Sequence, residues 1–201
     1  MTYQGFEEEQ IWLEQARRGN KEAFGMLIEA YQAPVFNLAY RMLGNAGDAE
    51  DAAQETFIRA YKAINRYDPN RKFSTWLLSI ASNYCIDQHR RRKLPSFSMD
   101  AFDSPVIPDK AKGLEAMLMQ DEQESEISAL LDSLHPKDKA AVVMRYWYDY
   151  SYNEIAEALS LSVSAVKSRL HRARKELAEV WIDSQKETLA IERKRYEQST
   201  I

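Results

Sequence analysis

The sequence predicts an all-α protein made of two small helical domains that a flexible linker joins. Apolar residues recur at spacings of three and four along most of the 201 residues, which is the period of an α-helix. Runs that alternate apolar and polar residues, as β-strands do, are absent, and only six residues are glycine. A stretch rich in proline and serine, Leu94–Lys112, interrupts the pattern. These observations indicate helices on both sides of a linker.

The first domain is expected to span residues 1–94. Gly44 suits a left-handed C-terminal cap, Pro34 marks a break between helices, and Ser74 suits an N-terminal cap. The polar Asn65–Lys72 loop has turn-forming residues at its centre. The helices expected from these signals are Phe6–Arg18, Asn20–Tyr31, the segment after Pro34 to Gly44, Asp48–Ile64 and Ser74–Arg92.

Residues 95–112 form the expected linker, because their prolines, serines and aspartates leave little apolar surface to bury. Such a segment is mobile unless a partner orders it. The second domain is expected to span residues 113–182, with Pro136 at the first position of one of its helices. A charged tail, residues 183–201, is expected to extend the last helix.

The most informative stretch is Ser151–Lys175, SYNEIAEALSLSVSAVKSRLHRARK, which predicts a helix-turn-helix. Ser151 and Glu154 have the spacing of a capping box at the start of a short first helix. Leu161 and Ser162 make the turn, and Ser162 can cap the second helix. The apolar stripe of that second helix consists of Val163, Val166, Leu170, Ala173 and Leu177.

The remaining surface of this second helix carries only small polar and cationic groups. No acid occurs between Leu161 and Lys175, so the surface is available for phosphates and base edges. A solvated basic surface is the alternative, although such surfaces usually mix charges of both signs. The candidate DNA-contacting residues are Ser164, Lys167, Ser168, Arg169, His171 and Arg172.

The helix Asp48–Ile64 carries a candidate protein-binding surface. Ile58 lies among acids and amides on its outer side, which favours contact with another protein. A single exposed apolar residue is also common on surfaces that bind nothing. The outer candidates are Asp51, Gln54, Glu55 and Ile58. The predicted inner side consists of Ala49, Ala52, Ala53, Thr56, Phe57, Ala60, Tyr61 and Ile64.

The helix Ser74–Arg92 aligns a tryptophan with polar and charged side chains at helical spacing. Tryptophan can stack on an unpaired base, asparagine and arginine can contact base edges, and the cations of Arg90–Lys93 can hold phosphates. Alternatively, Trp76 completes the hydrophobic core and the cations are a solvated helix end. The candidates on this side are Trp76, Asn83, Asp87, Arg90 and Arg91.

Charge and cysteine content limit the remaining function classes. The net charge of −4 is compatible with DNA binding, because the cations gather in Arg90–Lys93 and Lys167–Lys175 and phosphate attraction is local. The single cysteine, Cys85, excludes an internal disulfide and fits a reducing compartment. No apolar run could span a bilayer, and no secretory signal opens the chain. We therefore expect a cytoplasmic protein.

Catalysis is not expected. Cys85 and His89 could place two metal ligands on one helix, but no further cysteine or closely spaced histidine completes a site. No glycine-rich phosphate loop or nucleophile motif occurs. We predict no catalytic residue, no metal and no cofactor.

Three stretches, in this order, resemble bacterial sigma factors of the sigma-70 family and, more narrowly, its extracytoplasmic-function (ECF) group. They are DAEDAAQETFIRAYKAI, RKFSTWLLSIASNYCIDQHRRRK and LSLSVSAVKSRLHRARKEL. The two domains that contain them cover Glu22 to about Val180. By this resemblance residues 1–94 are sigma region 2 and residues 113–182 are sigma region 4, and the short linker agrees with the loss of the middle regions in this group.

The resemblance implies a role for each candidate surface. The outer side of Asp48–Ile64 would dock on the β′ clamp helices of core RNA polymerase. The Asn65–Lys72 loop and the Trp76 side of Ser74–Arg92 would open the minus-10 promoter element and capture an unstacked base. The helix with Ser164 and Arg172 would enter the major groove at the minus-35 element. The resemblance further implies the polymerase β flap and an anti-sigma factor as partners, without direct insertion into a membrane.

Two features depart from the family pattern. Ser164-Ala165 stands where the family often has Gly-Thr, and the tail after Asp183 exceeds the usual end of the second domain. The tail could bind a regulator or be a solvated helix, and its composition favours the second. The competing function is a free-standing regulator that dimerises on an operator. Such a regulator needs a dimer interface, for which only the tail is a candidate, and has no use for the Trp76 side.

Overall fold

The structure, a computed structural model, describes residues 3–93 and 126–199, with side chains over residues 7–92 and 126–186. These residues form helices joined by turns and short loops, and no strand occurs among them. The predicted all-α class is therefore confirmed. The expected linker, residues 95–112, and the first residues of the expected second domain, 113–125, lie outside the described residues.

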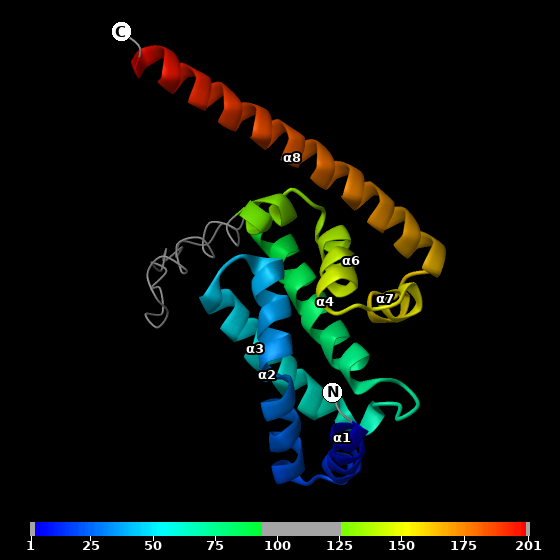
Figure 1. Ribbon diagram of the computed structural model, residues 1–201. Coiled ribbons are helices and arrows are strands. Elements are labelled where there is room, and N and C mark those ends of the chain that lie inside the picture. Colours follow the sequence, from blue (N-terminus) through cyan, green and yellow to red (C-terminus); the bar gives the residue numbers. More distant parts are fainter. Residues whose placement is uncertain (1–2, 94–125, 200–201) are drawn as a thin grey trace.

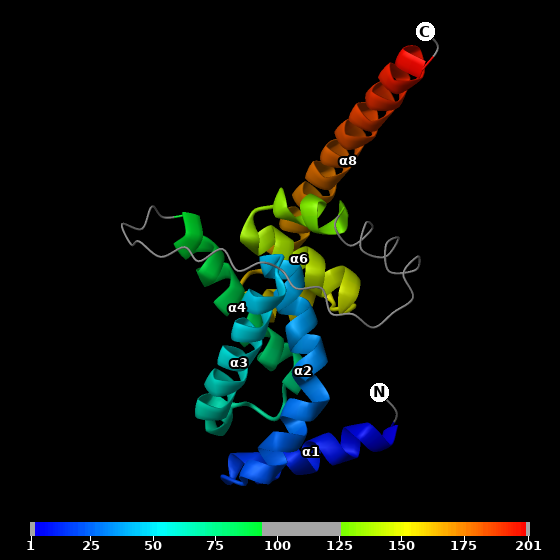
Figure 2. The ribbon, with the colours of Figure 1, turned by 90° about the vertical axis from the view of Figure 1, so that its left-hand side faces the viewer.

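The N-terminal part is a bundle of helices (Figure 1), and the C-terminal part ends in one long helix. The N-terminal elements are α1 (Tyr3–Arg17), α2 (Lys21–Leu43), α3 (Ala46–Ala63), the 3-10 turn η1 (Ile64–Arg66) and α4 (Phe73–Lys93). The C-terminal elements are helical residues 126–132, α6 (Pro136–Trp147), α7 (Tyr152–Ala158) and α8 (Val163–Ser199). α8 continues through the expected tail as far as Ser199, and Figure 2 shows the C-terminal half of this helix projecting away from the rest of the molecule.

Local capping signals place the ends of α2 as predicted. Asn20 accepts a hydrogen bond from the backbone N–H of Ala23 at 3.0 Å. Gly44 adopts a left-handed φ of 81°, and its N–H bonds to the carbonyl of Tyr40 at 2.8 Å. These contacts involve residues within four positions of each other, which is why the sequence alone reveals them.

The predicted break at Pro34 is wrong, because α2 runs through this proline without interruption. A proline in a helix interior costs about 3 kcal/mol through the lost hydrogen bond and a steric clash. Here the buried stripe that begins with Leu27 and Tyr31 before the proline continues with Val35 and Leu38 after it. The burial of one continuous apolar stripe outweighs the local cost.

The predicted cap at Ser74 is also wrong, since α4 begins at Phe73 and Ser74 lies inside its first turn. Phe73 is buried and packs edge-to-face on Tyr31 and Tyr67, with ring centroids 5.3 and 5.5 Å apart. These tertiary contacts fix the start of the helix before the serine.

The inner side of α3 agrees with prediction except at one position. Tyr61 was expected to be inside but is 41% exposed, at the edge of the bundle, where its ring packs edge-on against Phe24 at 5.0 Å. A large aromatic side chain near the end of the helix covers its neighbour without entering the core. The residues that are buried or half-buried as predicted are Ala49, Ala52, Ala53, Thr56, Phe57, Ala60 and Ile64.

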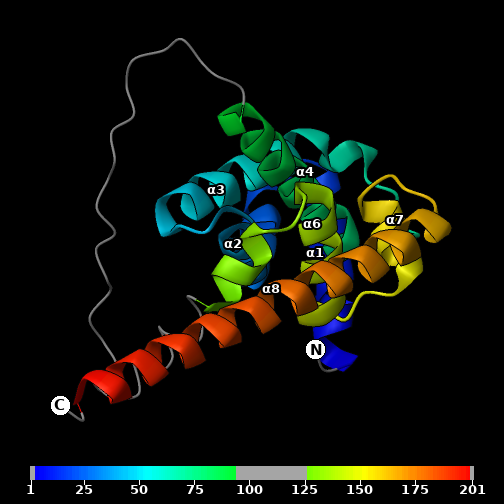
Figure 3. The same cartoon turned by 90° about the horizontal axis from the view of Figure 1, so that it is seen from above.

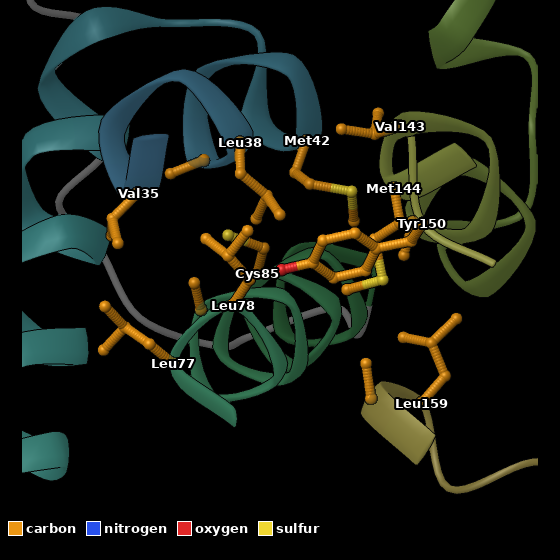
Figure 4. Packing of buried hydrophobic residues seen from close by; sticks show 14 of the residues in the cluster. Val35, Leu38, Met42, Leu77, Leu78, Cys85, Val143, Met144, Tyr150 and Leu159 are labelled. Atoms are coloured by element: carbon orange, nitrogen blue, oxygen red, sulfur yellow. The ribbon is translucent and has the colours of Figure 1, made fainter. Parts of the chain in front are cut away.

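The N-terminal and C-terminal parts pack together over one continuous hydrophobic core, which the sequence did not predict. α6 lies against α2 and α4, α7 lies against α4, and α8 crosses over α6 (Figure 3). Figure 4 shows the ring of Tyr150, from the loop after α6, among the buried side chains of α2 and α4. The Tyr148 hydroxyl donates to the Pro34 carbonyl at 2.5 Å. This packing brings the candidate surfaces of the two parts close to each other.

No helix among the described residues is both long enough and apolar enough to cross a membrane.

Candidate nucleic-acid interface

The start of the helix-turn-helix is fixed by the predicted capping box. The Ser151 N–H donates to Glu154 Oε2 at 2.8 Å, and the Glu154 N–H donates to Ser151 Oγ at 3.3 Å. Ser162 Oγ accepts from the Ala165 N–H at 3.1 Å, which confirms the predicted cap of α8. Local capping contacts therefore define where both helices begin.

The N-terminal half of α8 exposes the predicted polar surface. Val166, Leu170 and Ala173 are buried against the rest of the C-terminal part. This fixes the rotation of the helix about its own axis and turns the opposite side to solvent. The candidates that lie exposed on it are Ser164, Lys167, Ser168, His171 and Arg172.

Arg169, the remaining candidate on α8, points toward the protein. Its guanidinium donates to the carboxylate of Asp138 at 2.6 Å, and its side chain is only 23% exposed. Arg172, one turn further, is 64% exposed and lies 3.9 Å from the same carboxylate. The structure thus separates two arginines that the sequence placed on one surface.

An exposed aromatic residue beside α8 was missed by sequence reasoning. Tyr152 opens α7, and the ammonium of Lys167 and the guanidinium of Arg145 lie 5.9 and 5.8 Å from its ring centroid. The contacts are of the cation–π type and hold both cations near the candidate surface. The position next to the capping serine carries no pattern that would have singled it out.

On α4 the candidate residues are exposed to different degrees. Trp76 is half-buried, and its ring packs against Tyr67 and Phe73 with centroids 5.2 and 5.6 Å apart. Asn83 is exposed, and the Asp87 carboxylate forms an ion pair with a guanidinium one turn on at 3.4 Å. The candidates are placed as follows: Trp76 at the edge of the aromatic cluster, Asn83 and Asp87 on the middle of the helix, and Arg90 and Arg91 exposed near its end.

The loop before α4 is joined to α7 by two ion pairs. Lys72 Nζ lies 2.7 Å from Glu154, and Arg71 Nε lies 2.9 Å from Glu157. Partial burial tends to raise the pKa of Glu154, but the hydrogen bonds from Lys72 and from the N–H and hydroxyl of Ser151 hold that pKa below its ordinary value. Residues 82 apart in sequence are joined here, so no local pattern could have revealed the contact.

The outer side of α3 presents a mixed polar and apolar surface. Asp51 and Gln54 are exposed, and Ile58 is 41% exposed between them and the end of the helix. Glu55 is partly engaged by Arg59, whose Nε lies 2.7 Å from its carboxylate. The four predicted residues therefore share one accessible side of α3.

The Cys85 and His89 pair is not suited to hold a metal. Cys85 is buried in the core, and burial raises the pKa of its thiol to about 12, as for a cysteine that packs as a small apolar side chain. Among the side chains that the structure describes, no group of three or more His, Cys, Asp or Glu is arranged to bind a metal ion.

Two family descriptions match the chain in the order of its two parts. Sigma-70 region 2 matches residues 27–94, and Sigma-70, region 4 matches residues 124–177. The chain is 37% identical over 174 residues to the ECF RNA polymerase sigma factor SigW of Bacillus subtilis (strain 168), covering 82% of this chain and 92% of that protein. It is 32% identical over 175 residues to the RNA polymerase sigma-H factor of Pseudomonas aeruginosa, covering 84% and 91%.

Solved structures agree with these matches. CnrH, in its complex with the cytosolic domain of CnrY, superposes with a TM-score of 0.67 at 26% identity, covering 88% of this chain and 98% of that chain. The sigma factor RpoE from Bartonella quintana, in complex with the anti-sigma factor NepR, has the same fold, with a TM-score of 0.59 at 20% identity over 79% and 96%. The chain belongs to the ECF group of the sigma-70 family of RNA polymerase sigma factors.

Proposed function

We propose that three surfaces of this chain bind three different partners. The outer side of α3 binds polymerase, α4 with the loop before it binds the minus-10 element, and the start of α8 binds the minus-35 element. As a member of the family, the chain binds core RNA polymerase and directs promoter-specific initiation. The observation that carries the assignment is the pairing of the two matched sigma regions with an exposed, acid-free surface on α8.

The minus-35 surface is assigned to the residues of α8 that face solvent. Their hydroxyl, imidazole and cationic groups suit contacts to base edges and phosphates in the major groove. We leave Arg169 out of the contacting set, because its ion pair with Asp138 directs it inward. The assigned residues are Ser164, Lys167, Ser168, His171 and Arg172.

The minus-10 surface is assigned to one side of α4 and the Asn65–Lys72 loop. An extruded base needs a platform that compensates for the lost stacking, and the half-buried Trp76 beside Tyr67 supplies aromatic area at the surface. The assigned residues on α4 are Trp76, Asn83, Asp87, Arg90 and Arg91.

The polymerase surface is assigned to Asp51, Gln54, Glu55 and Ile58, which we propose contact the β′ clamp helices. The second part would contact the β flap. We assign residues 1–94 to region 2, 95–112 to the linker, 113–182 to region 4 and 183–201 to a charged helical tail. The chain needs no cofactor or catalytic residue in this role, since the polymerase carries out the chemistry.

We further propose an anti-sigma factor as the regulator of this chain. CnrH and RpoE, the two structural neighbours named above, are each seen with a protein partner, which for RpoE is an anti-sigma factor. The place of action would be the cytoplasm, where core polymerase resides. The dimeric regulator is not favoured, because it gives no role to the matched region 2. A footprint with two symmetric half-sites in the absence of polymerase would favour it.

Co-purification with bacterial core RNA polymerase tests the assignment. The double variant Asp51→Lys/Gln54→Ala is expected to lose binding that the wild type has. The matched control Glu29→Lys changes an exposed acid on a different helix, α2, and is expected to bind. Equal binding by all three would move the polymerase surface away from α3. No binding by any of them, with DNA binding intact, would contradict the sigma assignment itself.

A further inference from the structure

Asp138 is a buried carboxylate that contacts the DNA-facing helix from behind. It is the third residue of α6 and only 6% exposed. A buried charge requires partners, and Asp138 finds them on α8: Arg169 at 2.6 Å and Arg172 at 3.9 Å. A single carboxylate thus touches two arginines that are one helical turn apart.

The two arginines differ in what they can still reach. Arg169 lies mostly against the protein, whereas Arg172 keeps most of its side chain in solvent. A guanidinium carries five donors in a planar fork, so one edge can face a carboxylate while the other edge remains free for a base. Arg172 is placed for this double use, with Asp138 behind it and the solvent side of α8 in front.

We propose that Asp138 is a positioning residue for promoter recognition, which holds α8 through Arg169 and orients Arg172 toward the base edges of the minus-35 element. This inference rests on the proposed minus-35 role of α8. An arginine that is already restrained loses less conformational entropy when it binds. The restraint therefore strengthens the contact to a base edge, because that contact needs a defined geometry.

Positioning and simple electrostatics predict opposite results. If Asp138 acted only as a negative charge near DNA, its neutralisation would strengthen binding to all sequences. If it positions Arg172, neutralisation lowers the ratio of specific to nonspecific binding while phosphate attraction stays or rises. The discrimination ratio, rather than the affinity for one promoter, is therefore the quantity to measure.

The experiment uses the complete holoenzyme on promoter fragments with single base-pair changes in the minus-35 element. Arg172→Ala first identifies the base pair whose discrimination depends on Arg172. Asp138→Asn is then expected to lower discrimination at the same base pair by roughly tenfold, with no further loss in the Arg172→Ala/Asp138→Asn double variant. Asp149→Asn, which removes an exposed carboxylate paired with Arg145 in the same part of the chain, is the matched control and should keep wild-type discrimination.

Unchanged discrimination in Asp138→Asn, or fully additive losses in the double variant, would overturn the inference. If Arg172→Ala loses discrimination at no base pair, the proposed role of Arg172 fails as well, and this outcome is distinct from a failure of Asp138 alone. Thermal unfolding checks that each variant folds. If Asp138→Asn does not fold, Asp138→Asn/Arg169→Gln carries the same test, because it leaves no unpaired buried charge.

Discussion

At the scale of single residues, the environment decides whether a polar side chain supports the fold or meets a partner. Arg169 and Arg172 are the same residue type three positions apart on α8, yet Arg169 is held by Asp138 while Arg172 faces solvent. Trp76 can serve both the fold and a partner, since it packs in an aromatic cluster and is still partly exposed at the surface.

Replacing Trp76 with alanine is expected to impair strand opening more than binding to closed promoter DNA. The lost stacking on an extruded base is worth about 1–3 kcal/mol. Permanganate reactivity of minus-10 thymines reports opening, and gel-shift affinity at low temperature reports closed binding. Trp12→Ala, which removes a half-buried tryptophan from α1, is the matched control for lost packing. Unchanged permanganate reactivity in the Trp76 variant would make this residue a core residue only.

Cys85 is expected to resist thiol reagents in the folded protein. Its side chain is buried, and burial raises its pKa to about 12, so both access and thiolate are lacking. Reaction with a disulfide reagent at mildly alkaline pH should be slow for the native chain and fast in denaturant. A fast stoichiometric reaction of the native protein would show that α4 opens readily around this residue.

At the scale of elements, α7 depends on contacts beyond its own length. A helix of seven residues is not stable alone in water. The capping box at its start and the packing of α7 against α4 and α8 supply what the helix lacks. Glu154 serves both purposes, because its carboxylate accepts from the Ser151 N–H and pairs with Lys72.

The Glu154→Gln variant is expected to be less stable than wild type at neutral pH, by less than about 1 kcal/mol for a pair this exposed. The pKa of Glu154 lies below its ordinary value of 4.5, so its stabilising effect is complete above that pH and is lost as the pH falls further. The difference between variant and wild type in denaturant unfolding should therefore disappear on acidification. Glu50→Gln, at an exposed position of α3, is the control and should match wild type throughout.

At the scale of the whole molecule, the two surfaces that we propose bind DNA lie too close together to reach both promoter elements at once. The minus-10 and minus-35 elements are separated by about 25 base pairs, or roughly 85 Å at 3.4 Å per base pair. Here Lys72, in the loop just before α4, forms an ion pair with Glu154 of α7, and α7 is only about 10 Å long before the turn into α8. The N-terminal and C-terminal parts must therefore separate before both elements are bound.

Separation can be measured by energy transfer between dyes on Lys62→Cys in α3 and Glu179→Cys in α8, both exposed positions. Transfer is expected to be high in the free chain and to fall when holoenzyme binds promoter DNA. The buried Cys85 should leave labelling confined to the introduced cysteines. A dye pair within the N-terminal part, Glu22→Cys with Lys62→Cys, is the control and should not change. High transfer retained in the promoter complex would contradict the required separation.

The sequence by itself determined the helical class, the caps at Ser151, Ser162 and Gly44, and the side of α8 that faces solvent. Each of these depends on residues within a few positions of one another, where helical periodicity and capping chemistry act. The course of α2 through Pro34 could not be predicted this way, because burial along the whole helix overrides the local penalty.

Only the tertiary structure decided which charged groups remain available to partners. Asp138 and Arg169 are 31 residues apart, and Lys72 and Glu154 are 82 apart. The shared core around Tyr150 likewise joins elements that are distant in the chain. Such pairs form when apolar burial brings separate helices together, and a local sequence pattern does not predict which helices will pack against each other.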